Sequence, residues 1–83
     1  MNMVAIFKVQ FITHSGDRVI ETVKQTKANA LNAAVAKYYR AKRAKDFYPK
    51  ELSKQIQFAI SHIRRSPGSY KVTEIESPDY SNN

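Results

Sequence analysis

The sequence contains no cysteine and no tryptophan, and it has only two glycines and three prolines among its 83 residues. Without cysteine the fold has no disulfide and no thiolate metal ligand, so the packing of its core must hold it together. Few glycines and prolines favour helices and strands over long loops. The hydrophobic fraction of 42% and the charged fraction of 25% are typical of a folded globular chain.

Long apolar runs are also missing. No stretch approaches the roughly 18 consecutive apolar residues of a membrane span, and the N-terminal region lacks the basic, apolar and small-residue order of a signal peptide. A chain of 83 residues is at most one domain. We expect a soluble, cytoplasmic protein without membrane association, consisting of one α+β domain over residues 1–76 and a disordered polar tail over residues 77–83.

Motifs of catalysis and cofactor binding are absent from the sequence. It contains no Gly-rich phosphate loop, no Gly-x-Ser-x-Gly and no His-Glu-x-x-His. His14 and His62 lack partners at metal-ligand spacing, apart from Asp17 close to His14, and we expect both to be ordinary surface residues. Glu74 and Glu76 fall on one face of a predicted strand but have no histidine or third carboxylate nearby. The sequence therefore predicts a protein that is not an enzyme and that binds no metal and no cofactor.

Three segments have the composition of β-strands. Residues 3–13 are rich in β-branched and aromatic residues, and from Phe7 onward apolar side chains alternate with polar ones. Residues 18–25 follow a short turn that contains Gly16, which predicts an antiparallel hairpin. Residues 69–76 form the third predicted strand.

Two helices are expected between the second and third strands. Residues 27–45 are alanine-rich and lack Gly and Pro, which favours a helix. Pro49 suits the first position of a second helix, and the Ser-Pro-Gly sequence at 66–68 ends it. The apolar stripes of these helices consist of Leu31, Ala34, Val35 and Tyr38 in the first, and of Leu52, Ile56, Ala59 and Ile63 in the second.

The order ββααβ predicts an α+β fold, in which a small three-stranded sheet carries two helices packed on one face. If the two helices run antiparallel, the chain returns to the end of the sheet where they began. The third strand then lies antiparallel beside the second strand, or parallel beside the first. The sequence leaves both arrangements open.

Positive charge is concentrated in the middle of the chain. The net charge is +7, and residues 24–65 carry eleven basic residues but only two acidic ones. The stretch AKYYRAKRAK, residues 36–45, has two tyrosines, five Lys or Arg residues and no acid. A helix that only faces solvent usually mixes charges of both signs, with Glu placed to pair with Lys. On the helical wheel Tyr38 falls in the core stripe and Tyr39 at its edge, so the fold itself would orient the basic side chains.

These features predict a small, basic, non-enzymatic protein that binds DNA or RNA. Lys and Arg neutralise phosphates and release counterions, and Tyr can stack on an unpaired base, so sequence specificity would be low. The predicted nucleic-acid contacts are Lys37, Tyr39, Arg40, Lys42, Arg43, Lys45, Lys54, Arg64 and Arg65.

Other interpretations stay open. Lys and Arg are good helix formers and can simply cover a solvated face. An acidic protein surface attracts the same charges, so the chain could instead be a non-catalytic regulator or inhibitor, similar to the accessory proteins of mobile elements, that docks on a protein partner. Phe58 is the candidate partner-binding residue, unless the third strand or the tail covers it. An open sheet edge or the Phe58 side of the second helix could also support a homodimer.

Overall fold

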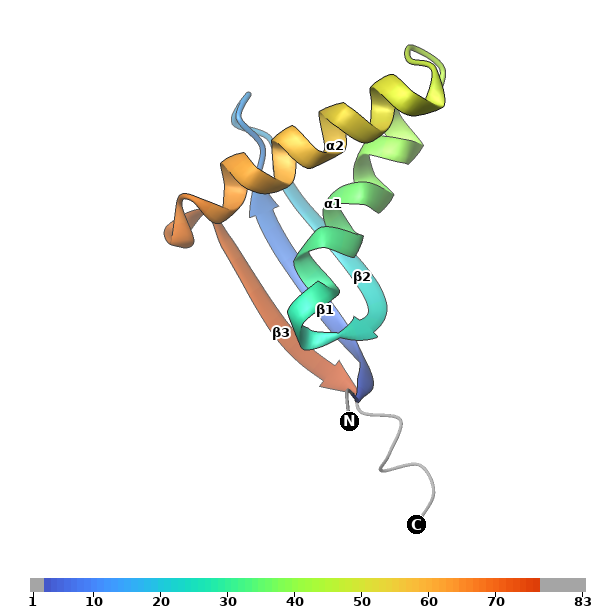
Figure 1. Ribbon diagram of the computed structural model, residues 1–83. Coiled ribbons are helices and arrows are strands. Elements are labelled where there is room, and N and C mark those ends of the chain that lie inside the picture. Colours follow the sequence, from blue (N-terminus) through green and yellow to red (C-terminus); the bar gives the residue numbers. More distant parts are fainter. Residues whose placement is uncertain (1–2, 77–83) are drawn as a thin grey trace.

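The computed structural model describes residues 3–76, which form an α+β fold with the predicted ββααβ order. A three-stranded antiparallel sheet lies behind two helices (Figure 1). In chain order the elements are β1 (Val4–Ile12), β2 (Arg18–Thr26), α1 (Lys27–Arg43), α2 (Pro49–Arg64), a single turn of 3-10 helix, η1 (Pro67–Ser69), and β3 (Tyr70–Glu76). The polar tail predicted for residues 77–83 lies outside the described residues.

The strands have the order β2-β1-β3, so β1 is the central strand. It pairs along its whole length with β2, from Val4 opposite Thr26 to Ile12 opposite Arg18. On its other side β1 pairs antiparallel with β3, from Phe11 opposite Tyr70 to Ile6 opposite Glu76. The register shifts between Ile6 and Phe7. A central strand is buried on its helix-covered face and flanked on both edges, which accounts for the apolar character of the 3–13 segment.

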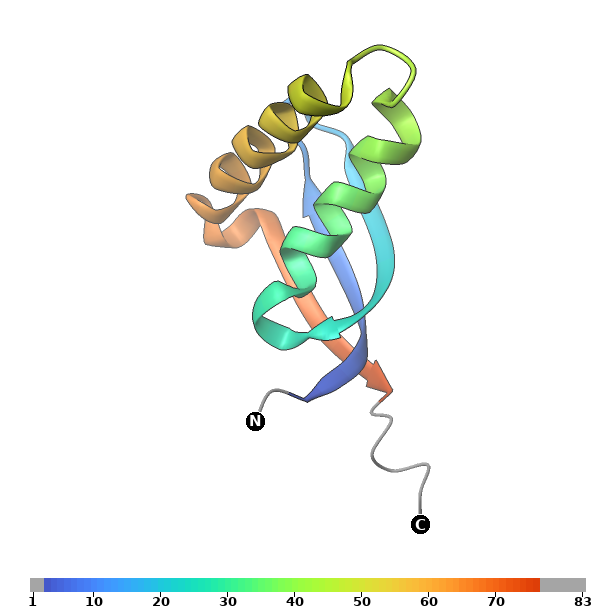
Figure 2. The same ribbon diagram turned by 45° about the vertical axis from the view of Figure 1, so that its right-hand side comes forward.

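Both arrangements predicted for the third strand are wrong. We expected β3 to pair antiparallel with β2 or parallel with β1, whereas it pairs antiparallel with β1. The reason is the path of the helices, which do not run antiparallel to each other. α1 runs along the sheet towards the β1–β2 turn, and α2 then crosses over that same end of the sheet (Figures 1 and 2). The chain therefore enters β3 beside the end of β1 and runs back along it.

One face of the sheet is buried against the helices. Phe7, Val9 and Phe11 of β1 are at most 2% exposed and form the centre of the core. The helices add the buried residues Ala30, Leu31, Ala34, Val35, Leu52, Ile56, Ala59, Ile60 and Ile63. Both predicted helix stripes are therefore confirmed, with Tyr38 half-buried at the margin of the core. Alanines on α1 leave room for the large side chains of β1, so helix and sheet interlock.

Within residues 3–76 we find no helix that combines the length and the apolar character needed to cross a bilayer.

Truncation of Phe11 to alanine should destabilise the protein by about 3–5 kcal/mol, because it removes buried surface and leaves a cavity at the junction of β1 and α1. Denaturant unfolding measures this loss. Ile20→Ala on β2 serves as the control, because Ile20 is 63% exposed, and we expect a change within about 0.5 kcal/mol. Equal effects of the two substitutions would contradict this description of the core.

Candidate nucleic-acid interface

The last turn of α1 is the centre of the candidate interface. It carries Arg40, Lys42 and Arg43, where positive charge also complements the helix dipole. α1 ends at Arg43 rather than at Lys45, so Lys45 lies in the turn that leads to α2. Arg40, Arg43 and Lys45 are exposed, and their side chains form no ion pair or hydrogen bond within the part of the chain that the structure describes. Their charges are therefore available to a ligand.

Tyr38 and Tyr39 fix this turn to the body of the protein. The Tyr38 ring meets buried Phe11 edge to face, with 5.9 Å between ring centroids. The Tyr39 ring lies edge to face on Tyr38 at 5.2 Å. Such aromatic pairs add stabilisation beyond the area they bury. Tyr38 and Tyr39 are both half-buried and both pack against the core, rather than Tyr38 alone lying in the core stripe.

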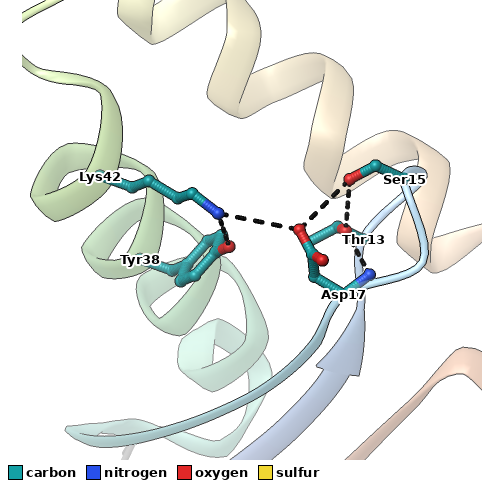
Figure 3. A network of polar contacts seen from close by, with 5 residues as sticks. All are labelled: Thr13, Ser15, Asp17, Tyr38 and Lys42. Carbon is teal, nitrogen blue, oxygen red and sulfur yellow. Dashed lines mark hydrogen bonds and ion pairs between the residues drawn. The ribbon is translucent and has the colours of Figure 1, made fainter.

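Lys42 joins α1 to the β1–β2 turn (Figure 3). Its Nζ donates a hydrogen bond of 3.0 Å to Tyr38 Oη and lies 5.4 Å from the centroid of the same ring. The same Nζ is 3.7 Å from Asp17 Oδ2. Since Asp17 offsets part of its charge, Lys42 is a weaker phosphate ligand than Arg40 or Arg43.

The β1–β2 turn holds Asp17 in position for this contact (Figure 3). The backbone N–H of Asp17 donates to Thr13 Oγ1 at 3.0 Å, and Ser15 Oγ donates to Asp17 Oδ2 at 3.4 Å. Gly16 has a φ of 92°, a conformation that costs glycine little and other residues much more. The short turn predicted from the sequence therefore also orders one side of the interface.

A cleft of about 260 Å³ lies between the end of α1, α2 and the β1–β2 turn. Its aromatic lining consists of Tyr38, Tyr39, Phe47 and Phe58, and its charged or polar lining of Thr13, His14, Ser15, Asp17, Lys42, Arg43 and Gln55. Aromatic side chains beside cations are the combination that binds single-stranded nucleic acid, through stacking and phosphate contacts. Four residues singled out in the sequence, Tyr39, Lys42, Arg43 and Phe58, meet in this cleft.

An aromatic cluster that the sequence did not reveal adjoins the cleft. We predicted that His14 and His62 are ordinary surface residues; both are exposed, and in addition the ring of each contacts Phe58. The ring centroids of His14 and His62 are 6.0 Å apart, and Phe58 stacks on His62 with an interplanar angle of 18°. Their proximity depends on α2 crossing the β1–β2 turn, which no spacing in the sequence encodes. Residues 3–76 contain no group of three or more side chains suited to hold a metal ion.

Other predicted contact residues lie away from the cleft and have partners within the fold. Lys37 Nζ donates to the carbonyl of Thr22 on β2 at 2.9 Å and lies 3.7 Å from Glu21 Oε1. Arg64 Nη2 donates to Asn32 Oδ1 at 2.9 Å, which ties α2 to the first half of α1.

Two further predicted residues sit on the outside of α2. Arg65 Nε donates to the carbonyl of Ser61 at 3.3 Å, within the final turn of the helix. Lys54 is exposed on the second turn, and its side chain makes no hydrogen bond or ion pair to the other described residues. Arg64 and Arg65 lie about ten residues beyond Lys54, roughly 15 Å along the helix at 1.5 Å per residue. The basic surface is therefore compact around the end of α1 and sparse along α2.

Two groups of the interface have raised pKa values. Burial raises the pKa of the Tyr39 hydroxyl, and the neighbouring Tyr38 adds to this, against the opposing effect of Arg43 and Lys42. The hydrogen bond to Tyr38 raises the pKa of Lys42. At neutral pH Tyr39 is therefore uncharged and Lys42 is positive, which suits an aromatic wall beside a cationic rim.

Stability should fall as the pH rises above 10. The pKa of Tyr39 in the folded state lies above the reference value of 10.0. The contribution of the uncharged hydroxyl to the free energy of unfolding is therefore complete below pH 10 and is lost as the pH rises through the folded-state pKa. Thermal unfolding at increasing pH measures this loss. Tyr39→Phe cannot ionise, so its melting temperature should decline less steeply than that of the unaltered protein; an identical decline would contradict the burial of the hydroxyl.

Comparison of the chain with models of protein families gave no match. Comparisons with curated proteins and with solved structures gave no match either. A function must therefore be inferred from the residues of this chain and from their geometry.

Proposed function

We propose that this protein binds DNA or RNA through the end of α1 and the adjoining cleft. The observation that supports this most directly is the group of three unpaired cations at the end of α1 and just beyond it, Arg40, Arg43 and Lys45, of which Arg43 lines an aromatic cleft. Because no carboxylate among the described residues pairs with them, a phosphate binds without first breaking an ion pair. Guanidinium groups also match the geometry of phosphate oxygens, which they bind through two parallel hydrogen bonds.

The cleft favours unpaired bases over a regular duplex. Tyr39 and Phe58 lie in its lining together with Arg43, so a base can stack there while its phosphate meets the guanidinium group. Phe58 is 56% exposed, so its ring is accessible to a ligand. Stacking accepts every base, and phosphate contacts carry no sequence information. We therefore propose a preference for single-stranded regions with low sequence specificity.

Replacement of Arg40 and Arg43 with glutamate should abolish binding and flatten its salt dependence, because these side chains supply the free charges of the interface. Gel shift or fluorescence anisotropy with DNA and RNA oligonucleotides over a range of salt concentrations measures both effects. Lys24→Glu with Lys27→Glu changes the net charge equally at the opposite end of α1, and we expect this control to retain most of the affinity.

Equal losses in the two double variants would show that only net charge matters and that the end of α1 is not a site. If the unaltered protein shows no salt-sensitive binding of DNA or RNA at low ionic strength, the proposal is wrong. Docking on an acidic protein partner would then be the better hypothesis.

Stacking is tested separately from charge. Tyr39→Leu combined with Phe58→Leu should weaken binding of a single-stranded oligonucleotide about tenfold or more, since each stacked base contributes about 1–3 kcal/mol. The slope of the logarithm of affinity against the logarithm of salt concentration should stay the same, because the cations remain. Tyr48→Leu is the control, since Tyr48 is 79% exposed and does not line the cleft. An effect of Tyr48→Leu as large as that of the double variant would contradict the role of the cleft.

A further inference from the structure

The sheet has a second face that neither helix covers. Both helices lie on the same side of the sheet (Figure 1), and side chains alternate between its two faces along each strand. We call the uncovered side the open face. It consists of Lys8, Gln10, Ile12, Arg18, Ile20, Thr22, Lys71 and Thr73. The open face ends at Lys8 and its partners; beyond it, across the register shift, Ile6 pairs with Lys24 and with Glu76.

The open face is basic. Three of its eight positions are Lys or Arg, and none is Asp or Glu. Glu21 and Glu74 are paired with Val9 and Phe7 and therefore belong to the helix-covered face, and Glu76 pairs with Ile6 beyond the open face. Within residues 3–75 the three basic side chains form no ion pair or hydrogen bond. A second cationic surface therefore lies on different elements from the first.

One end of the open face carries an apolar hollow. This shallow hollow of about 240 Å³ is lined by Ile12 and Ile20, with Arg18 at its β2 side and Lys71 at its β3 side. Ile20 is 63% exposed. An exposed aliphatic side chain gains stability when a partner removes it from water. The hollow thus offers an apolar contact between two cations.

We propose that the open face docks an acidic protein segment that places an apolar side chain in this hollow, between Arg18 and Lys71. The proposal does not depend on nucleic-acid binding at the end of α1. A second copy of the chain is a poor occupant, because the three basic residues of each copy would face one another. Nucleic acid is a poorer fit than protein, because the open-face apolar residues of the hollow are aliphatic, with half-buried Tyr70 at its β3 side, and phosphates would leave Ile20 uncovered.

The strand geometry sets the spacing of the partner's acidic groups. The register places Ile20 and Lys71 on opposite sides of Gln10, and Arg18 opposite Ile12, two residues along β1. Two strand spacings of roughly 4.8 Å and two residues of roughly 3.4 Å put the Cα atoms of Arg18 and Lys71 about 12 Å apart. An extended segment covers this distance in about four residues. We therefore expect two carboxylates about four residues apart, with the apolar side chain between them.

A short fluorescein-labelled peptide with this spacing of glutamates and a central phenylalanine tests the proposal by fluorescence anisotropy. Arg18→Glu with Lys71→Glu should weaken peptide binding at least about tenfold, and Ile20→Thr, which keeps a β-branched residue on the strand, should weaken it several-fold. Arg40→Glu with Arg43→Glu is the control, because it changes the net charge by the same amount at the end of α1, and it should keep most of the affinity for the peptide. Replacing the peptide's phenylalanine with alanine should weaken binding as Ile20→Thr does.

Several results would overturn the proposal. They are absence of peptide binding by the unaltered protein, equal losses in the two double variants, and equal affinity for the alanine peptide. Circular dichroism and thermal unfolding of each variant separate loss of binding from loss of fold. If Arg18→Glu with Lys71→Glu weakens binding of a single-stranded oligonucleotide more than binding of the peptide, the open face is a nucleic-acid surface instead.

Discussion

Burial of one face of β1 is the constraint on which the basic end of α1 depends. Phe11 is almost fully buried, and its ring contacts the ring of Tyr38 edge to face. The hydroxyl of Tyr38 in turn accepts a hydrogen bond from Lys42. Lys42 reaches Asp17 in the β1–β2 turn. A chain of contacts therefore runs from the centre of the core to the charged rim of the cleft. The cations beyond it project from a fixed helical turn, so a ligand has less entropy of ordering to overcome than it would with a free basic tail.

The positive charges have three different roles in the fold. Lys37 and Arg64 bind backbone and side-chain oxygens of neighbouring elements and so fasten α1 to β2 and to α2. Arg40 and Arg43 have no such partner among the described residues and are available to a ligand. The cations of the open face surround aliphatic side chains instead of aromatic ones. Positive charge therefore lies beside aromatic side chains at the end of α1 and beside aliphatic side chains on the open face, and our two proposals rest on this difference.

The sequence was sufficient to predict the elements, the core stripes and the turn at Gly16, because each follows from local periodicity or from a local backbone requirement. It was not sufficient to place β3, since the direction in which a chain leaves a helix pair depends on the crossing angle of the two helices. The cluster of His14, Phe58 and His62 was missed for the same reason. The composition of residues 36–45 singled out Tyr39 and Arg43, which line the cleft, but it did not show that α2 forms the opposite side of that cleft.

Chemical-shift mapping of the backbone amides, with a single-stranded oligonucleotide added at low salt, tests the central claim most directly. If the end of α1 is a nucleic-acid surface, the largest shifts will fall on the segment from Tyr38 to Phe47, on the β1–β2 turn and around Phe58. The amides of β3 will change little. Shifts concentrated on β2 and β3, or no shifts at saturating oligonucleotide, would contradict the claim.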